Sequence, residues 1–278
     1  MKTGLVTGDW LERQLGAADL AVVDATFFLP GSERDAAAEF VAAHIPGARR
    51  MDLDAVADPA CPGAHRGPDA ATFGAAMNAI GVGRDDRIIV YDHSPLHSAA
   101  RGWMMLRHFG ADQVAVLDGG LAQWIAESRP LEAGKPMVRR ARFDPAPRAG
   151  EIVTKRDLIY SSGVPIADPR PPARFEGREP DLRPGIASGH IPGSRNIPLG
   201  ELYRPDGTLR PAAELAATFA AAGIDPLQPF IASCGSGITA CSLILAAATL
   251  GGREARLYPG SWAEWGADPN TPKAVGPA

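Results

Sequence analysis

The sequence contains one short segment twice, HIPGA at residues 44–48 and HIPGS at residues 190–194. Upstream of each copy lies a short apolar run that ends in an aspartate, Asp24 in the first case and Asp168 in the second. Downstream lie two further related segments, GGLAQW and GSWAEW. Three landmarks that recur in the same order at nearly the same spacing indicate an internal duplication, which is far longer than a solenoid unit.

The duplication predicts two copies of a whole domain. Between them, residues 129–150 are rich in proline and glycine, which is typical of a linker that crosses a surface. We therefore expect an N-terminal domain over residues 1–135, a linker over 136–150 and a C-terminal domain over 151–278.

Each half alternates short β-branched runs with helical stretches. In the first half, RIIVY at 87–91 and VAVL at 114–117 predict buried strands on either side of a helix over 98–109. The second half repeats this order around a helix over 238–250, which ends at a Gly-Gly pair. Strands joined by helical crossovers predict an α/β fold with two tandem domains, each a parallel sheet flanked by helices.

Bulk composition excludes several classes of protein. A charged fraction of 22%, a net charge of −4 and the lack of a Lys/Arg-rich run give no sign of a nucleic-acid partner. No apolar run approaches the roughly 18 residues that span a membrane. The first ten residues have no long apolar core after Lys2, so we expect a cytoplasmic location.

The three cysteines are Cys61, Cys234 and Cys241, with no CxxC pair among them. This sparse, odd set argues against a disulfide framework and against a zinc site, so no metal is expected. Cys241 lies within the predicted helix and is expected to pack in the core. Cys61 lies in a Pro/Gly-rich loop and has no predicted role.

Cys234 stands where a predicted strand ends and a helix begins, which is where open α/β sheets place their chemistry. Its loop reads CGSGITA, and two glycines in four positions let the backbone curl so that successive N–H groups point inward. Such a nest stabilises a thiolate, makes it a better nucleophile and would hold a persulfide anion. A buried cysteine that only fills space is the alternative, although it needs no Gly-Ser-Gly loop.

The first copy serves as an internal control. Counting back from Cys234 by the spacing between Trp124 and Trp265 places His93 opposite the cysteine, so the first copy has no thiol. We expect one active and one catalytically inactive domain. His44 and His190 recur in both copies, including the copy without a thiol, and this predicts a structural role for them.

Tandem domains with a repeated HIPG segment, and a loop cysteine only in the second, resemble the two-domain rhodanese family over nearly the whole chain. The loop is similar to that of the family's 3-mercaptopyruvate-using branch. The thiosulfate-using branch carries Arg and Lys directly after the cysteine, where this sequence has Gly235 and Ser236. Thiosulfate is a dianion that gains from such cations, whereas mercaptopyruvate has a single carboxylate.

The resemblance also implies site residues. Arg174 and Arg183 fall on the two arginines of the family's substrate-binding stretch and would grip a carboxylate, while Arg178 is expected to be a surface charge. The loop residues that would contact the substrate are Gly235, Gly237, Ile238 and Thr239.

The family is further proposed to use a serine, a histidine and an aspartate near the cysteine. Ser236 matches the serine, and Asp54 and His65 match the other two by their spacing after the first HIPG segment, although the residues around His65 depart from the family's pattern. If all three match, the inactive domain supplies catalytic support for proton transfer.

These features predict a ping-pong sulfurtransferase that moves sulfur from 3-mercaptopyruvate through a Cys234 persulfide and releases pyruvate. The acceptor would be cyanide, a small thiol or a thioredoxin-like protein, and no metal or organic cofactor is required. Two alternatives stay open: the same chemistry with thiosulfate as the donor, and a non-catalytic module that binds sulfide or another small anion.

Overall fold

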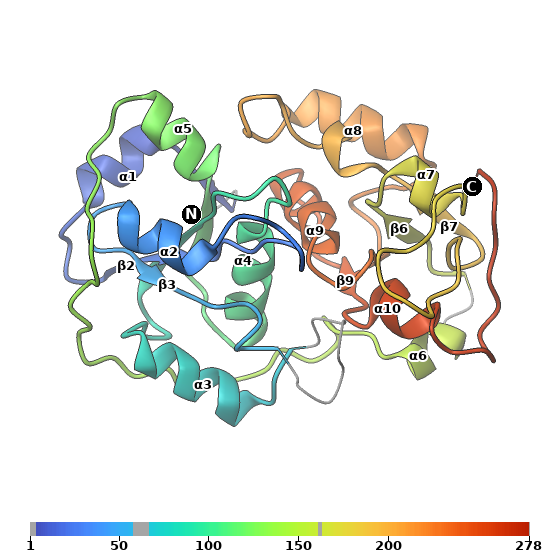
Figure 1. The fold of residues 1–278 in the computed structure, drawn as a ribbon, viewed down its shortest axis with the longest axis horizontal. Helices are drawn as coiled ribbons and strands as arrows, with labels where there is room; N and C mark the ends of the chain where they lie inside the picture. Colours follow the sequence, from blue (N-terminus) through green and yellow to red (C-terminus); the bar gives the residue numbers. More distant parts are fainter. Residues whose placement is uncertain (1–3, 58–66, 161–162, 278) are drawn as a thin grey trace. The chain divides into compact units, whose positions relative to one another are not determined.

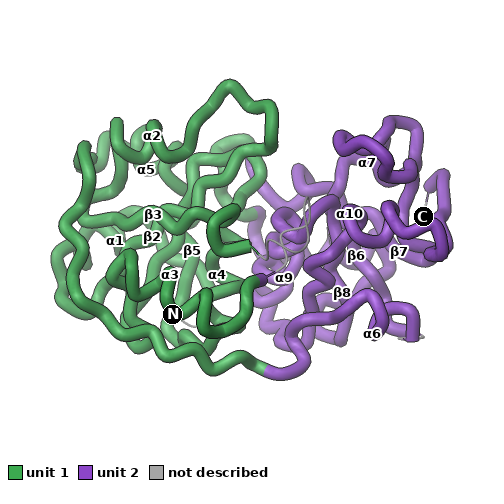
Figure 2. Tube along the Cα trace, turned by 60° about the horizontal axis from the view of Figure 1, so that its bottom comes forward, with its two compact units in different colours: residues 1–57, 68–148, 205–209 green, residues 58–67, 149–204, 210–278 purple. Residues whose placement is uncertain are grey.

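The computed structural model describes residues 4–57, 67–160 and 163–277. Cys61 and His65 lie outside these described residues. The chain folds into two compact units, which Figure 2 colours separately. Unit 1 comprises residues 1–57, 68–148 and 205–209, and unit 2 is built mainly from residues 149–204 and 210–278.

Unit 1 is a five-stranded parallel sheet with the strand order β1-β5-β4-β2-β3. The strand predictions at 87–91 and 114–117 are confirmed as β4 and β5, and the helix between them is α4. The strands are β1 (Leu5–Val6), β2 (Leu20–Asp24), β3 (Arg49–Arg50), β4 (Arg87–Tyr91) and β5 (Val114–Leu117). The helices are α1 (Gly8–Gln14), α2 (Ala36–Ala42), α3 (Ala70–Ala79), α4 (Ala99–His108) and α5 (Gly120–Ala126).

Unit 2 repeats this plan with a four-stranded parallel sheet in the order β7-β6-β8-β9. Its strands are β6 (Ile166–Asp168), β7 (Ser194–Asn196), β8 (Ile231–Ala232) and β9 (Arg256–Leu257). Its helices are α6 (Lys155–Tyr160), α7 (Pro172–Phe175), η1 (Leu199–Glu201), α8 (Ala212–Ala221), α9 (Ala240–Thr249) and α10 (Ser261–Trp265). The helix predicted over 238–250 is α9, and the strand before it is shorter than its apolar run.

Helices cover both faces of each sheet. In unit 1, α1, α2 and α5 pack on one face through Leu11, Phe40 and Trp124, and α3 and α4 lie on the other (Figure 1). In unit 2, α6 and α10 pack on one face, and α9 packs on the other against β6, β8 and β9. Most side chains of α4 and α9 are buried. The helix α9 is apolar along most of its surface, as expected for a buried helix, whereas α4 also carries Arg101, Arg107 and His108.

The repeated histidines have the same structural role in both units. His44 Nδ1 donates to the Phe40 carbonyl oxygen at 2.7 Å, and its ring stacks on the Phe40 ring with centroids 4.3 Å apart. His190 Nδ1 donates to the Phe175 carbonyl oxygen at 2.8 Å and stacks on Phe175 at 3.9 Å. Both histidines are buried. Each one therefore ties the turn of its HIPG segment to a neighbouring helix, as their repetition predicts.

Replacing His190 with Ala should destabilise unit 2 without removing its chemistry. The variant loses a buried hydrogen bond and a stacked ring, so the free energy of unfolding in urea should fall by about 3 kcal/mol. Turnover per folded molecule should stay near the wild-type value at low temperature. A loss of turnover with unchanged unfolding would instead assign His190 to the reaction.

Candidate active site in unit 2

Cys234 follows strand β8 and precedes α9, at the carboxyl end of the parallel sheet. Its side chain is buried, with 1% of its surface exposed. The Gly237 N–H donates to Cys234 Sγ at 3.1 Å, and Ser261 Oγ lies 3.9 Å from the same sulfur. The sulfur therefore lies inside a curled loop with the Gly237 N–H directed at it, an arrangement that stabilises negative charge.

The loop needs a glycine at position 237. Gly237 has φ 87°, and a Cβ atom there would lie 2.6 Å from the Pro259 carbonyl oxygen. Any other residue would be strained in this conformation and would clash with the backbone that leads into α10. The sequence argument from the two loop glycines is thus correct for Gly237, whose turn aims its N–H at the sulfur.

The first turn of α10 holds the loop from the other side. The Trp262 N–H donates to the Cys234 carbonyl oxygen, and the Ala263 N–H donates to the Gly235 carbonyl oxygen, both at 2.9 Å. N–H groups at a helix start have no partner within their own helix, and loop carbonyls need donors. Each element therefore satisfies the backbone groups that the other leaves unpaired.

Ser261 is a site residue that the sequence argument missed. It is fully buried, its φ is 51°, and its Oγ accepts from the Cys234 N–H at 3.0 Å and donates to the Tyr258 carbonyl oxygen at 2.9 Å. A positive φ is costly for a residue with a Cβ, and such strain persists where the surroundings enforce it. The signal was available in the repeat, because the first copy has Gly120 where the second has Ser261.

The remaining loop residues lie around the cysteine as a continuous segment. Gly235, Ser236 and Thr239 are partly exposed, and Ile238 is buried. Cys241 is buried in α9, and its Sγ donates to the Gly237 carbonyl oxygen at 3.5 Å, in agreement with its predicted place in the core. The roles of these loop residues toward a substrate stay predictions.

The two predicted clamp arginines differ in their surroundings. Arg183 lies against the loop, and its Nη1 donates to the Gly235 carbonyl oxygen at 2.8 Å. Its Nε and Nη2 both donate to Asp181, at 2.8 and 2.9 Å. Arg174, in α7, is partly exposed, and within the described residues its guanidinium has no hydrogen bond or ion pair. Arg178 pairs with Glu176 at the surface, as expected for a solvated charge.

The predicted serine, histidine and aspartate do not belong to one unit of the described structure. Ser236 belongs to unit 2, and Asp54 belongs to unit 1, where it is exposed in the segment after β3. His65 lies outside the described residues. A shared proton-transfer role for these three residues therefore stays a prediction.

A family model described as a rhodanese-like domain matches residues 7–127 and, a second time, residues 155–268. The chain belongs to the rhodanese family. It is 40% identical over 274 residues to the 3-mercaptopyruvate sulfurtransferase of Escherichia coli strain K12, with 97% of each chain covered. It is 38% identical to the human 3-mercaptopyruvate sulfurtransferase over 94% of this chain and 91% of that one.

Solved structures agree with this assignment. SseA from Escherichia coli, described as a 3-mercaptopyruvate sulfotransferase with the rhodanese fold, matches with a TM-score of 0.85 at 39% identity. The match covers 94% of this chain and 99% of SseA. The prediction of two tandem rhodanese-like domains, each a parallel sheet flanked by helices, is confirmed.

In the first rhodanese-like domain, Asp92 takes the place of Cys234. The Leu121 N–H donates to the Asp92 carbonyl oxygen at 2.9 Å, which is the counterpart of the Trp262 bond to Cys234. The prediction that His93 stands opposite the cysteine is therefore wrong by one residue. The physical reason is that the connections between the strands and the tryptophan segments differ in length between the copies, so one spacing does not hold at every landmark.

Asp92 fills the first domain's loop with its own negative charge. Its carboxylate accepts from the Ser94 N–H at 3.0 Å and from the Ala99 N–H at 2.6 Å. Burial, with a smaller contribution from the nearby Asp24 charge, outweighs these two hydrogen bonds and raises the pKa of Asp92 from the ordinary value of 3.8 to about 6. The folded state thus binds the Asp92 proton more tightly than the unfolded chain does.

This raised pKa predicts the pH dependence of an Asp92→Asn variant. Stability from the protonated carboxyl is present below the unfolded pKa and is lost as pH rises through about 6. Relative to wild type, the variant should therefore gain up to about 3 kcal/mol in unfolding free energy between pH 4 and pH 7, at 1.4 kcal/mol per pKa unit. Urea unfolding at several pH values measures this, and parallel curves for the two proteins would contradict the prediction.

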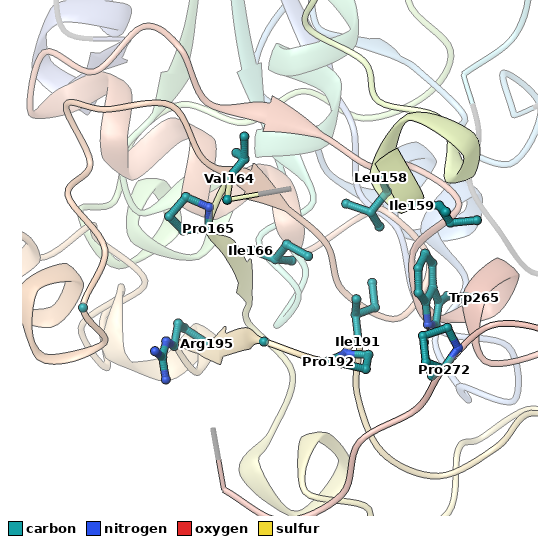
Figure 3. Close-up of a pocket in the computed structure, with 13 residues that line it drawn as sticks. Leu158, Ile159, Val164, Pro165, Ile166, Ile191, Pro192, Arg195, Trp265 and Pro272 are labelled. Atoms are coloured by element: carbon teal, nitrogen blue, oxygen red, sulfur yellow. Dashed lines mark hydrogen bonds between the residues drawn. The ribbon is translucent and has the colours of Figure 1, made fainter. Parts of the chain in front are cut away.

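The cavity drawn in Figure 3 is not part of the cysteine site. It has a volume of about 480 Å³ and is lined mainly by apolar side chains from α6, the start of β6 and α10, with Arg195 at one side. Val164, Pro165 and Ile166 place it at the amino end of β6. Cys234 follows the carboxyl end of the parallel strand β8, so the cavity lies at the opposite edge of the sheet.

Within the described residues, no group of three or more His, Cys, Asp and Glu side chains could hold a metal ion. No helix in the same part of the chain is both long and apolar enough to span a bilayer.

Proposed function

We propose that this protein is a 3-mercaptopyruvate sulfurtransferase that carries the transferred sulfur as a persulfide on Cys234. The observation that supports this proposal most strongly is the environment of the sulfur. Cys234 Sγ accepts from the Gly237 N–H at 3.1 Å and lies 3.9 Å from the Ser261 hydroxyl oxygen. Relatives over nearly the whole chain, bacterial and human, bear this activity in their names and support the choice of donor.

In the first half-reaction, the Cys234 thiolate attacks the sulfur of 3-mercaptopyruvate. The new S–S bond forms as the donor's C–S bond breaks, and the bonding electron pair leaves with the carbon as the enolate of pyruvate. A proton converts the enolate to pyruvate. Ser236, assisted by His65 and Asp54, is our candidate for the delivery of that proton.

In the second half-reaction, a nucleophilic acceptor attacks the outer sulfur of the persulfide. The S–S bond breaks, its electron pair returns to Cys234 as a thiolate, and the enzyme is ready for another donor. Cyanide, a small thiol or a thioredoxin-like protein would serve as the acceptor. Between the two steps, the Gly237 N–H, which donates to Sγ, stabilises the persulfide anion.

The donor preference follows from the charge near the loop. Gly235 and Ser236 add no positive charge next to the cysteine. The charge of Arg183 is paired with that of Asp181. Arg174, the other arginine predicted to bind the substrate carboxylate, has no acidic partner in the described residues. A donor with one carboxylate matches this modest positive charge better than a dianion does.

The two buried thiols allow a matched test of the nucleophile. Cys234→Ser should abolish pyruvate release from 3-mercaptopyruvate, because a serine hydroxyl cannot carry a sulfane sulfur. Cys241→Ser keeps a donor for the Gly237 carbonyl and should retain most of the activity. Near-wild-type release of pyruvate by the Cys234 variant would overturn the proposed function.

The two neighbouring arginines allow a matched test of the clamp. Arg174→Gln should raise the KM for 3-mercaptopyruvate by at least about tenfold, because a charge-assisted carboxylate contact contributes about 1.5–3 kcal/mol. Arg178→Gln removes the same charge from the surface pair with Glu176 and should leave KM unchanged. Equal KM values for the two variants would exclude Arg174 from substrate binding.

A further inference from the structure

Asp181 is the acidic residue that faces the cysteine loop through Arg183. Its Oδ1 accepts from Arg183 Nε at 2.8 Å and its Oδ2 accepts from Arg183 Nη2 at 2.9 Å. Oδ1 also accepts from the Arg183 backbone N–H at 3.0 Å. The Asp181 side chain is 7% exposed, against 27% for Arg183, so the carboxylate lies behind the guanidinium, away from solvent.

This pairing determines which edge of Arg183 is available. The Nε–Nη2 edge of a guanidinium is one that grips a carboxylate with two parallel bonds, and Asp181 already occupies it. Nη1 donates instead to the carbonyl oxygen of Gly235 at 2.8 Å, and Gly235 is the residue that follows Cys234 in the sequence. Arg183 therefore connects Asp181 to the cysteine loop, and its Nε–Nη2 edge is taken by Asp181.

The pair is also close to electrically neutral. Burial alone would raise the pKa of Asp181, but the hydrogen bonds and the positive charge of Arg183 outweigh burial and hold that pKa below its usual value. Asp181 is thus ionised at neutral pH and cancels most of the Arg183 charge felt at the loop. Since Coulomb energy scales with the product of the charges, this cancellation weakens the attraction of a dianion more than that of a monoanion.

We propose that Asp181 is a specificity-determining positioning residue: by pairing with Arg183 it favours a monoanionic sulfur donor over a dianionic one. The inference rests on the proposed sulfurtransferase function. It assigns the donor preference to the Asp181–Arg183 pair in addition to the uncharged loop positions. Asp181 itself touches neither the sulfur nor the donor.

The test compares kcat/KM for 3-mercaptopyruvate and thiosulfate in wild type and in Asp181→Asn. The amide keeps the size of the side chain and one acceptor while removing its charge, so the thiosulfate-to-mercaptopyruvate ratio should rise by about fivefold, the factor that a partly exposed ion pair is worth. The gain should shrink at high ionic strength. Asp181→Glu, which restores the charge, should move the ratio back toward wild type.

Glu176→Gln is the matched control, because Glu176 pairs with Arg178 in the same segment with the same sequence spacing, at the surface. Its donor ratio should equal that of wild type. Thermal unfolding checks that each variant is folded, and Asp181→Ala serves as a second uncharged variant if the asparagine protein is unstable.

The outcomes separate this inference from the proposed function. An unchanged ratio in a folded, uncharged variant, or an equal loss with both donors, would show that Asp181 is only structural and would overturn the inference. A wild-type protein that turns over neither donor would overturn the proposed function itself.

Discussion

The second domain depends on the hydrogen bonds between the first turn of α10 and the cysteine loop. The Trp262 and Ala263 N–H groups donate to the carbonyls of Cys234 and Gly235, and Ser261 Oγ accepts from the Cys234 N–H. These bonds pair the free donors of a helix start with the unpaired acceptors of a tight loop, in a place with little access for water. The position of the sulfur is therefore fixed by backbone hydrogen bonds and by the Ser261 hydroxyl, in a loop whose turn requires glycine at position 237.

The first domain shows what this scaffold does without a thiol. Leu121 makes the same bond to Asp92 that Trp262 makes to Cys234, so the backbone arrangement is shared. The two side chains differ in the free energy that their burial costs. Burying the charged Asp92 carboxylate carries a large desolvation penalty, whereas burying the neutral Cys234 thiol carries a small one. The first domain thus keeps the anion-binding geometry but occupies it with an anion of its own, which agrees with the expectation that only the second domain reacts.

Sequence periodicity and the repeat were enough to predict the α/β class, the duplication, and the strands and helix around Cys234, because these depend on local patterns of apolar residues. Gly237 and His190 were also predicted, since a loop glycine and a repeated histidine signal local backbone needs. The counterpart of Cys234 in the first domain was predicted one residue too late, at His93 instead of Asp92. The equivalence is defined by a hydrogen bond from α5 to Asp92 and not by a constant spacing. Ser261 and Asp181 were missed for a related reason: Ser261 reaches Cys234 from a separate segment, and Asp181 reaches the loop only through Arg183.

The central claim, that Cys234 carries the sulfur, is tested most directly by mass spectrometry of the protein after brief treatment with 3-mercaptopyruvate and no acceptor. The account predicts that peptide fragmentation locates a gain of the mass of one sulfur atom on Cys234 and none on Cys241. Treatment with cyanide should remove this gain. An unmodified Cys234 in a preparation that nevertheless releases pyruvate would contradict it.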